Sequence, residues 1–245
     1  MEDYYFDKIA RDYHYKRRKP WKPIEYYLKH LIERGYTFSG YTIDLGCANG
    51  RHFKLFKNNN NKLIGIDLSI EFLNITKKNL KDIEVYSKEE QNNIQIIHAD
   101  LKNLPIRENI IQNIFSIATI HHVKDKAERE KAIKDLYKIL KTNGYLVITV
   151  WRKWQRRYMG YFLNDLTKRI FKPYHKKYQE EQGLIEFGDK YVPWTLTEKK
   201  VTYNRFYHFF SKREIKKALE EFKIKEFLIR GGPSNKDNFF IFAQK

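Results

Sequence analysis

The sequence has a single cysteine, Cys47, among its 245 residues. One thiol cannot form a disulfide within the chain, and no His or Cys spacing typical of a zinc site is present, so we expect neither a disulfide framework nor a bound metal. No apolar run approaches the ~18 residues that a membrane-spanning helix needs. The N-terminus, MEDYYFD, is acidic and aromatic and does not resemble a signal peptide. We therefore expect a cytoplasmic protein with no membrane association.

Acidic residues are also scarce relative to basic ones. The chain has 48 Lys and Arg against 30 Asp and Glu, a formal net charge of +18. This charge says little about the fold, but it indicates a polyanionic partner, nucleic acid first and an anionic membrane second. Hydrophobic residues make up 42% of the chain. That content is ample for the core of one large α/β domain spanning residues 1–245.

The stretch Tyr41–Arg51, YTIDLGCANGR, carries the clearest motif. An apolar strand ends at Asp44, and a turn follows between Gly46 and Gly50. Glycine lets the backbone turn sharply and approach a ligand closely, and the start of a helix offers free N–H groups. The dinucleotide pattern G-x-G-x-x-G fails, because alanine and arginine occupy its second and third glycine positions. We interpret the stretch as the first strand, loop and helix of an S-adenosylmethionine (SAM) site.

Two later strands also end in an acid, Leu63–Asp67 and Ile94–Asp100. We expect Asp44 to hold the methionine ammonium, Asp67 to bind the ribose hydroxyls and Asp100 to accept from the adenine amino group. An ordinary α/β turn without a ligand would explain one such acid, but three in order favour SAM. The expected cofactor-binding residues are Asp44, Gly46, Cys47, Asn49, Gly50, Asp67, Leu68, Asp100, Leu101 and Ala118.

Predicted strands and helices alternate along most of the chain. This order predicts an α/β, Rossmann-like class I methyltransferase fold with a doubly wound seven-stranded sheet whose last strand is antiparallel. Asn143-Gly144 is expected to cap the helix before the fifth strand, and Ser211 to be an N-cap. We expect helices at Asp3–Tyr15, Ile24–Arg34, Ile70–Leu80, Lys126–Leu140 and Ser211–Phe222, and further strands at Ile110–Ile120, Tyr145–Trp151, Lys223–Arg230 and Asn238–Ala243.

Residues 152–204 interrupt this alternation as a basic and aromatic insertion. Within residues 152–177 there are nine Lys and Arg against one acid, interleaved with six aromatic residues. A nucleic-acid surface needs that combination, because cations neutralise phosphates and flat rings stack on bases. The alternative is an amphipathic helix whose aromatics are core and whose charges are solvated. We expect Gln182–Thr202 to be an irregular loop.

Stretches outside the cofactor motif resemble a known family. Over nearly its whole length the chain resembles the tRNA (5-carboxymethyluridine wobble) carboxyl methyltransferases. The distinctive matches are R-x-K-P-W at residues 17–21, and R-F-Y-H at residues 205–208 with D-N-F-F at residues 237–240. Ala48 stands where the family usually has glycine. Residues 152–190 correspond to a variable region, so an RNA role there rests on composition alone.

The resemblance implies methylation of the carboxylate of a carboxymethyl group on the wobble uridine, which gives a methyl ester. A carboxylate is ionised at neutral pH, so no general base is required. We expect Arg17 to orient it, because a guanidinium matches its shape, and His121 or His122 to hydrogen-bond the uracil or the carboxylate. A purely structural role is the alternative for the histidines. The expected substrate-binding residues are Lys19, Trp21, Trp151, Arg152, Arg156, Arg157, Trp194, Arg205, Tyr207, His208 and Asn238.

The resemblance also implies partners, namely the tRNA anticodon loop and a small zinc-binding activator protein. The activator would form a heterodimer along the edge strand Ile94–His98. Two other functions stay open: a small-molecule or lipid-precursor methyltransferase with the same core, and a non-catalytic RNA-binding module. The fourth strand lacks the Asn/Asp-Pro-Pro-Tyr/Phe ending of many nitrogen methyltransferases and has no nearby cysteine to attack a pyrimidine ring.

Overall fold

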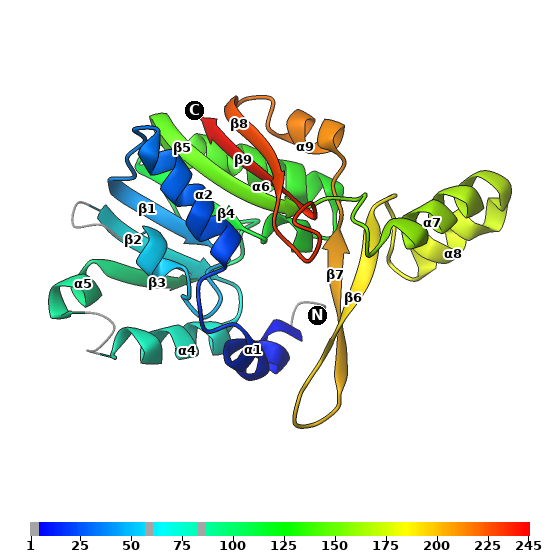
Figure 1. The fold of residues 1–245 in the computed structure, drawn as a ribbon, viewed down its shortest axis with the longest axis horizontal. Helices are drawn as coiled ribbons and strands as arrows, with labels where there is room; N and C mark the ends of the chain where they lie inside the picture. The colour runs from blue at the N-terminus through cyan, green and yellow to red at the C-terminus, as the bar shows by residue number, and fades with distance from the viewer. Residues whose placement is uncertain (1–4, 57–60, 83–86) are drawn as a thin grey trace.

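The computed structural model describes residues 5–56, 61–82 and 87–245. Seven strands form one sheet in the order β3-β2-β1-β4-β5-β9-β8, and β9 is antiparallel to both of its neighbours. This order confirms the predicted class I methyltransferase fold (Figure 1). The strands are β1 (Gly40–Leu45), β2 (Asn61–Asp67), β3 (Ile94–His98), β4 (Ile111–Ile117), β5 (Leu140–Trp151), β8 (Lys223–Arg230) and β9 (Asn238–Gln244).

Helices cover both faces of the sheet, so the central strands are apolar on both sides. On one face, α2 (Lys22–Glu33) contributes Tyr27 and Leu31, which share a core cluster with Phe115 and Phe242 of the sheet. The short helix α3 (Phe53–Phe56) packs into the same cluster. On the other face, α6 (Lys126–Ile139) and α9 (Lys212–Ala218) contribute Ile133, Leu136 and Ile215. The helices α4 (Ile70–Leu80) and α5 (Lys88–Asn92) lie beside the β3 end of the sheet (Figure 1).

Several boundaries differ from the sequence prediction. Helix α6 ends at Ile139 and β5 begins at Leu140, because Leu140 pairs with Ile111 ahead of a register shift. The Asn143-Gly144 turn therefore lies inside β5 and does not cap the helix. Ser211 is the N-cap as predicted, accepting from the Glu214 N–H at 3.2 Å, but α9 ends at Ala218. Helix α1 (Tyr5–Lys16) is present, while Asp3 lies outside the described residues.

The predicted irregular loop at residues 182–202 is wrong. Strand β6 (Asp189–Thr195) pairs with β7 (Thr202–His208) as an antiparallel ribbon. Pro193 made this stretch resemble a turn, but proline is tolerated where a strand edge needs no donor, as in a two-stranded ribbon.

The insertion also contains helices α7 (Met159–Phe171) and α8 (Pro173–Glu181). They project away from the large sheet beside the upper part of the β6–β7 ribbon (Figure 1). Tyr158, Phe162, Val192, Tyr207 and Phe209 form a separate apolar cluster that packs the insertion together. Among the described residues, no helix is both long enough and apolar enough to cross a membrane.

Candidate active site

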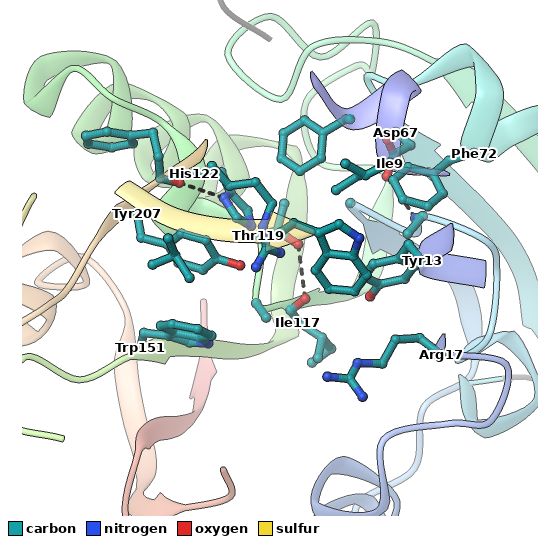
Figure 2. A pocket seen from close by; sticks show the side chains of 18 of the residues that line it. Ile9, Tyr13, Arg17, Asp67, Phe72, Ile117, Thr119, His122, Trp151 and Tyr207 are labelled. Carbon is teal, nitrogen blue, oxygen red and sulfur yellow. Dashed lines mark hydrogen bonds between the residues drawn. The ribbon is translucent and has the colours of Figure 1, made fainter. Parts of the chain in front are cut away.

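A cleft of about 1690 Å³ lies where the parallel strands end, lined by Leu45 of β1, Asp67 of β2 and Ile117 of β4. Ligands of open α/β sheets bind at this edge. Helix α1 lies against one side of the cleft and the β6–β7 ribbon against another (Figures 1 and 2). The large volume leaves room for a cofactor and part of a second substrate.

The loop after β1 has a backbone that only certain residues permit. Gly46 has φ 73°, and a Cβ there would lie 2.3 Å from Thr119 Oγ1. Its N–H donates to the Ile66 carbonyl at 2.8 Å, which ties the loop to β2. Ala48 adopts φ 49°, a left-handed conformation that costs a non-glycine residue roughly 1–2 kcal/mol. The loop is thus held close to the sheet and leaves the space above it for a ligand.

Asp67 closes this loop. Its Oδ2 accepts from the Ala48 N–H at 2.8 Å and its Oδ1 from the Ser69 N–H at 2.9 Å. Burial raises the pKa of Asp67 to about 6, although both N–H groups act in the opposite direction. Each oxygen keeps a second lone pair, so the carboxylate can also accept from ribose hydroxyls. Figure 2 shows Asp67 near Ile9 and Phe72.

Asp44 lies deeper, with 1% of its surface exposed. Burial, together with the charge of Asp67, raises the pKa of Asp44 well above its usual value. Its Oδ2 has no hydrogen-bond partner among the described residues. A buried polar atom without a partner indicates a missing donor, and a ligand ammonium would supply one and favour the ionised form. Because the next residues, Leu45, Gly46 and Cys47, line the cleft, the residues present fit SAM.

At the opposite end, the 3-10 helix η1 (Ile120–His122) follows β4. His122 Nδ1 lies 2.9 Å from the Phe206 carbonyl, so Nδ1 carries the proton and donates. Burial and the charge of Arg205 lower the pKa of His122 to about 3. Tyr207 packs edge-on against His122, with ring centroids 4.3 Å apart (Figure 2). This end of the cleft is therefore aromatic, with a neutral imidazole, and suits a methyl acceptor.

Comparison with known proteins agrees with this geometry. Residues 43–148 match the family model described as a methyltransferase domain. A tRNA (carboxymethyluridine(34)-5-O)-methyltransferase of Schizosaccharomyces pombe is 25% identical over 98% of this chain and 94% of its own. The Arabidopsis thaliana protein of that name is 30% identical over 60% of this chain. The matched region is only 31% of that relative's length. A SAM-dependent methyltransferase structure from Methanosarcina mazei superposes with a TM-score of 0.68, covering 88% of this chain and 96% of that one at 19% identity.

The chain is a class I SAM-dependent methyltransferase. Its cofactor is SAM, and the predicted cofactor residues divide into two groups. Asp44, Asn49 and Gly50 are not among the residues that line the cleft. Asn49 Nδ2 donates to the Arg17 carbonyl at 3.0 Å and pairs with His14 Nδ1 at 3.0 Å, so its contacts hold the α1–α2 link. The predicted cofactor residues that line the cleft are Gly46, Cys47, Asp67, Leu68, Asp100, Leu101 and Ala118.

The methyltransferase brings most, but not all, of the predicted substrate residues to the cleft. Four are not among the lining residues: His121, Arg152, Arg156 and His208. His121 is fully buried, and its Nδ1 lies 3.3 Å from the Trp151 N–H. Burial, with the charges of His122 and Arg205, lowers the pKa of His121 well below its usual value. Those that line the cleft are Arg17, Lys19, Trp21, His122, Trp151, Arg157, Trp194, Arg205, Tyr207 and Asn238.

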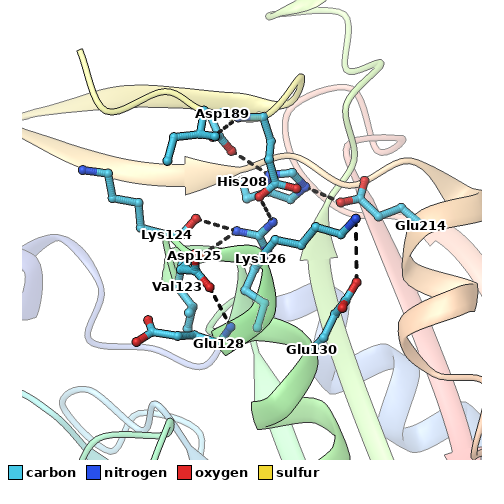
Figure 3. A network of polar contacts seen from close by, with 12 residues as sticks. Val123, Lys124, Asp125, Lys126, Glu128, Glu130, Asp189, His208 and Glu214 are labelled. Atoms are coloured by element: carbon cyan, nitrogen blue, oxygen red, sulfur yellow. Dashed lines mark hydrogen bonds and ion pairs between the residues drawn. The ribbon is translucent and has the colours of Figure 1, made fainter. Parts of the chain in front are cut away.

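The prediction for His208 needs correction. Its Nδ1 lies 2.7 Å from Asp189 and its Nε2 lies 2.6 Å from Glu214, so both ring nitrogens bind carboxylates (Figure 3). Burial is the largest single effect and acts to lower the pKa of His208. The hydrogen bonds to the two carboxylates outweigh it, so the pKa is raised above its usual value. His208 thus joins the end of the ribbon to α9 from inside the protein. Glu186 completes a group of three potential metal ligands with Asp189 and His208, but Arg129 already pairs with Glu186.

Helix α1 was missed as a part of the site. The Ser69 hydroxyl donates to Asp7 at 2.5 Å, which joins α1 to the cofactor side. Trp194 Nε1 donates to Asp12 at 2.7 Å, which joins α1 to the ribbon. Because α1 also places Tyr13 on the cleft, it links the end of the cleft beside Asp67 to the end beside His122. The only signal in the sequence was the amphipathic pattern of residues 5–13, which does not indicate where the helix packs.

Proposed function

We propose that this methyltransferase converts the carboxylate of a 5-carboxymethyl-type uridine, at the wobble position of tRNA, into its methyl ester. One observation carries the proposal: the likeness to the S. pombe enzyme of that printed activity extends over 98% of this chain and is not restricted to the cofactor-binding half. The cleft supports it, because its acceptor end combines aromatic rings with cationic side chains, the groups that a base and its anionic substituent need.

The residues present suit this chemistry without a general base. A carboxylate acceptor is already ionised at neutral pH, so the neutral His122 has no proton to remove and serves as a hydrogen-bonding wall. Bound SAM supplies a methyl group on a positively charged sulfur, so that transfer leaves a neutral ester and a neutral thioether with no proton to move. Asp67 and Asp44 hold the cofactor. The aromatic walls exclude water and fix the acceptor for in-line attack.

The tRNA is proposed to bind along the cationic surface between the cleft and the insertion. Arg17, Lys19 and Arg157 line the cleft and are exposed. Beyond them, Lys172, Lys176 and Lys177 are exposed on α8 and the turn before it. Exposed cations neutralise phosphates with little desolvation cost. Arg152 and Arg156 remain candidates for such contacts outside the cleft.

A small zinc-binding activator protein is proposed to pair with β3. This strand is an edge of the sheet, and its Ile96 and Ile97 are only half-buried. A partly apolar edge strand is a template for pairing with another chain. Co-expression with such an activator should raise the yield of active enzyme. An active monomer that runs as a single species in size-exclusion chromatography would argue against an obligate pair.

Nucleoside mass spectrometry of tRNA from cells with and without the gene tests the proposed reaction. The methyl ester should disappear from the wobble uridine without the gene, and the free acid or its amide should accumulate. Unchanged tRNA nucleosides would contradict the proposal and would favour a small-molecule substrate. We also propose that the enzyme acts in the cytoplasm, since tRNA is its proposed substrate, and subcellular fractionation would test this.

A further inference from the structure

Arg205 is a buried cation that has no acidic partner in the part of the chain that the structure describes. It lies on β7 opposite Val192, is 9% exposed and lines the cleft. Among the described residues, its buried Nε has no hydrogen-bond partner, and no carboxylate lies within ion-pair distance of the guanidinium. An uncompensated buried charge is costly, and an unpartnered buried donor that lines a cleft indicates an anion that binds there.

Two aromatic rings hold the guanidinium in place. Its central carbon lies 4.8 Å from the ring centroid of Trp194 and 5.1 Å from that of Tyr207. Such contacts use the faces of the planar group, so its N–H edges remain available for a bidentate bond to a carboxylate. Trp194 is itself fixed by its bond to Asp12. The guanidinium is therefore pre-organised before any ligand binds.

The titratable rings packed beside Arg205 are neutral. Burial raises the pKa of Tyr207 to about 12, and it lowers the pKa of both His121 and His122. Arg17, the residue that the sequence favoured for the carboxylate, is instead exposed on the α1–α2 link, with its side chain extending to the cleft (Figure 2). An ion pair is stronger in a buried, low-dielectric position than in an exposed one. The position of Arg205 therefore suits a single small anion, and that of Arg17 suits the tRNA backbone.

We propose that Arg205 binds the carboxylate that accepts the methyl group, while Arg17 contacts the rest of the tRNA. This proposal rests on the proposed function. It has a consequence for turnover: esterification removes the negative charge, so the product loses its bond to the guanidinium. The enzyme should therefore bind the carboxymethyl tRNA more tightly than the tRNA carrying the methyl ester.

The test measures the affinity of the SAM-free enzyme for two tRNAs, one with the free acid and one with the methyl ester at the same uridine. The wild-type enzyme should prefer the acid by about 10- to 100-fold, the usual range for a buried hydrogen bond to a charged group. Arg205→Gln should abolish this preference. Arg17→Gln should weaken binding of both tRNAs equally and should retain the preference for the acid. Arg213→Gln, an exposed α9 position outside the cleft, should match the wild type.

SAM binding by calorimetry reports whether each variant is folded. If Arg205→Gln does not bind SAM, then Arg205→Lys, which keeps the charge but not the planar fork, decides the question: its acid preference should fall severalfold. An undiminished preference in either Arg205 variant, or its loss in Arg17→Gln, would overturn the assignment. The proposed function fails separately, when the wild type neither prefers nor methylates the carboxymethyl tRNA.

Discussion

At the residue scale, Asp67 and His208 show how burial decides what a charged group does. Asp67 is half-buried and faces a cleft with lone pairs to spare, whereas His208 is fully buried and has both nitrogens engaged. The first is therefore available to a ligand, and the second holds the ribbon against α9. Their pKa shifts lead to separate predictions.

SAM affinity should fall as the pH drops below about 6, where Asp67 takes up a proton. A protonated carboxyl group loses acceptor capacity for ribose hydroxyls. The effect on stability has the opposite sign: because the pKa is higher in the folded state, this group lowers the free energy of unfolding as the pH rises from about 4 to 6. Calorimetry at pH 7.5, 6.5 and 5.5 measures the affinity. Asp67→Asn should bind weakly at pH 7.5 and lose most of the pH dependence, and a flat wild-type profile would contradict this role.

His208→Ala should lower the free energy of unfolding by roughly 3–5 kcal/mol, because it leaves the buried Asp189 carboxylate unpaired. The raised pKa of His208 means that its stabilisation is fully present below pH 6.5 and is lost as the pH rises through the folded-state pKa. Urea unfolding at pH 6 and pH 9 would measure both effects. A variant as stable as the wild type, or one that loses the acid preference for tRNA while folded, would show that His208 does something else.

At the element scale, α1 and the β6–β7 ribbon determine the shape of the cleft. Neither belongs to the seven-stranded sheet, and they meet through Asp12, which accepts from Trp194 and from the Thr197 N–H at 2.9 Å. Bonds to Lys16, Thr197 and Trp194 lower the pKa of Asp12 to about 2, although burial acts against them. Asp12 is therefore an ionised tether at neutral pH.

Asp12→Ala should raise the KM for tRNA severalfold while changing SAM affinity little, because it releases Trp194 and the ribbon but not the cofactor loop. Steady-state kinetics and hydrogen exchange over residues 189–208 would measure this, with faster exchange expected in the variant. Asp135→Ala, which removes a surface carboxylate on α6, is the matched control. Equal KM values for Asp12→Ala and the control would rule out the tether.

The sequence predicted the sheet much better than these additions. Strand-end acids and the alternation of strands and helices determine the Rossmann-like order, because each parallel strand needs a covering helix. The ribbon was not predicted, because Pro193 interrupts the sequence pattern of a strand. In the structure, Pro193 nevertheless lies opposite Asn204 in the ribbon. His208 was misassigned because a motif shows which residues occur together but not which way they point. Arg205 was predicted to bind substrate, but its burial without an acidic partner among the described residues is visible only in three dimensions.

At the scale of the whole molecule, only part of the net charge of +18 is available to a partner. Some of the cations in the insertion pair internally, as Arg169 does with Asp165 at 2.9 Å, and Lys153 is buried. Others remain exposed on the projecting α7–α8 hairpin, beside apolar side chains such as Phe171, which is 78% exposed. The composition therefore overstates how many cations of the insertion are exposed, and an RNA surface there stays a prediction.

Replacing Lys172, Lys176 and Lys177 together with glutamine should weaken tRNA binding and reduce its salt dependence. Each lost phosphate contact should lower the slope of log affinity against log salt by about 0.7–0.9. The matched control replaces Lys77, Lys78 and Lys81, which are exposed on and after α4. Binding titrations from 50 to 200 mM salt would measure both. Equal slopes for the two triple variants would remove the hairpin from the RNA surface.

A tRNA carboxylate is proposed to receive the methyl group. Purified enzyme, with its activator if one is required, should transfer labelled methyl from SAM to tRNA bearing carboxymethyluridine, and mild alkali should release the label as methanol because the product is an ester. The same tRNA with unmodified uridine should receive no label. Label that resists alkali, or equal labelling of unmodified tRNA, would show that the acceptor is not the carboxylate and would contradict the account.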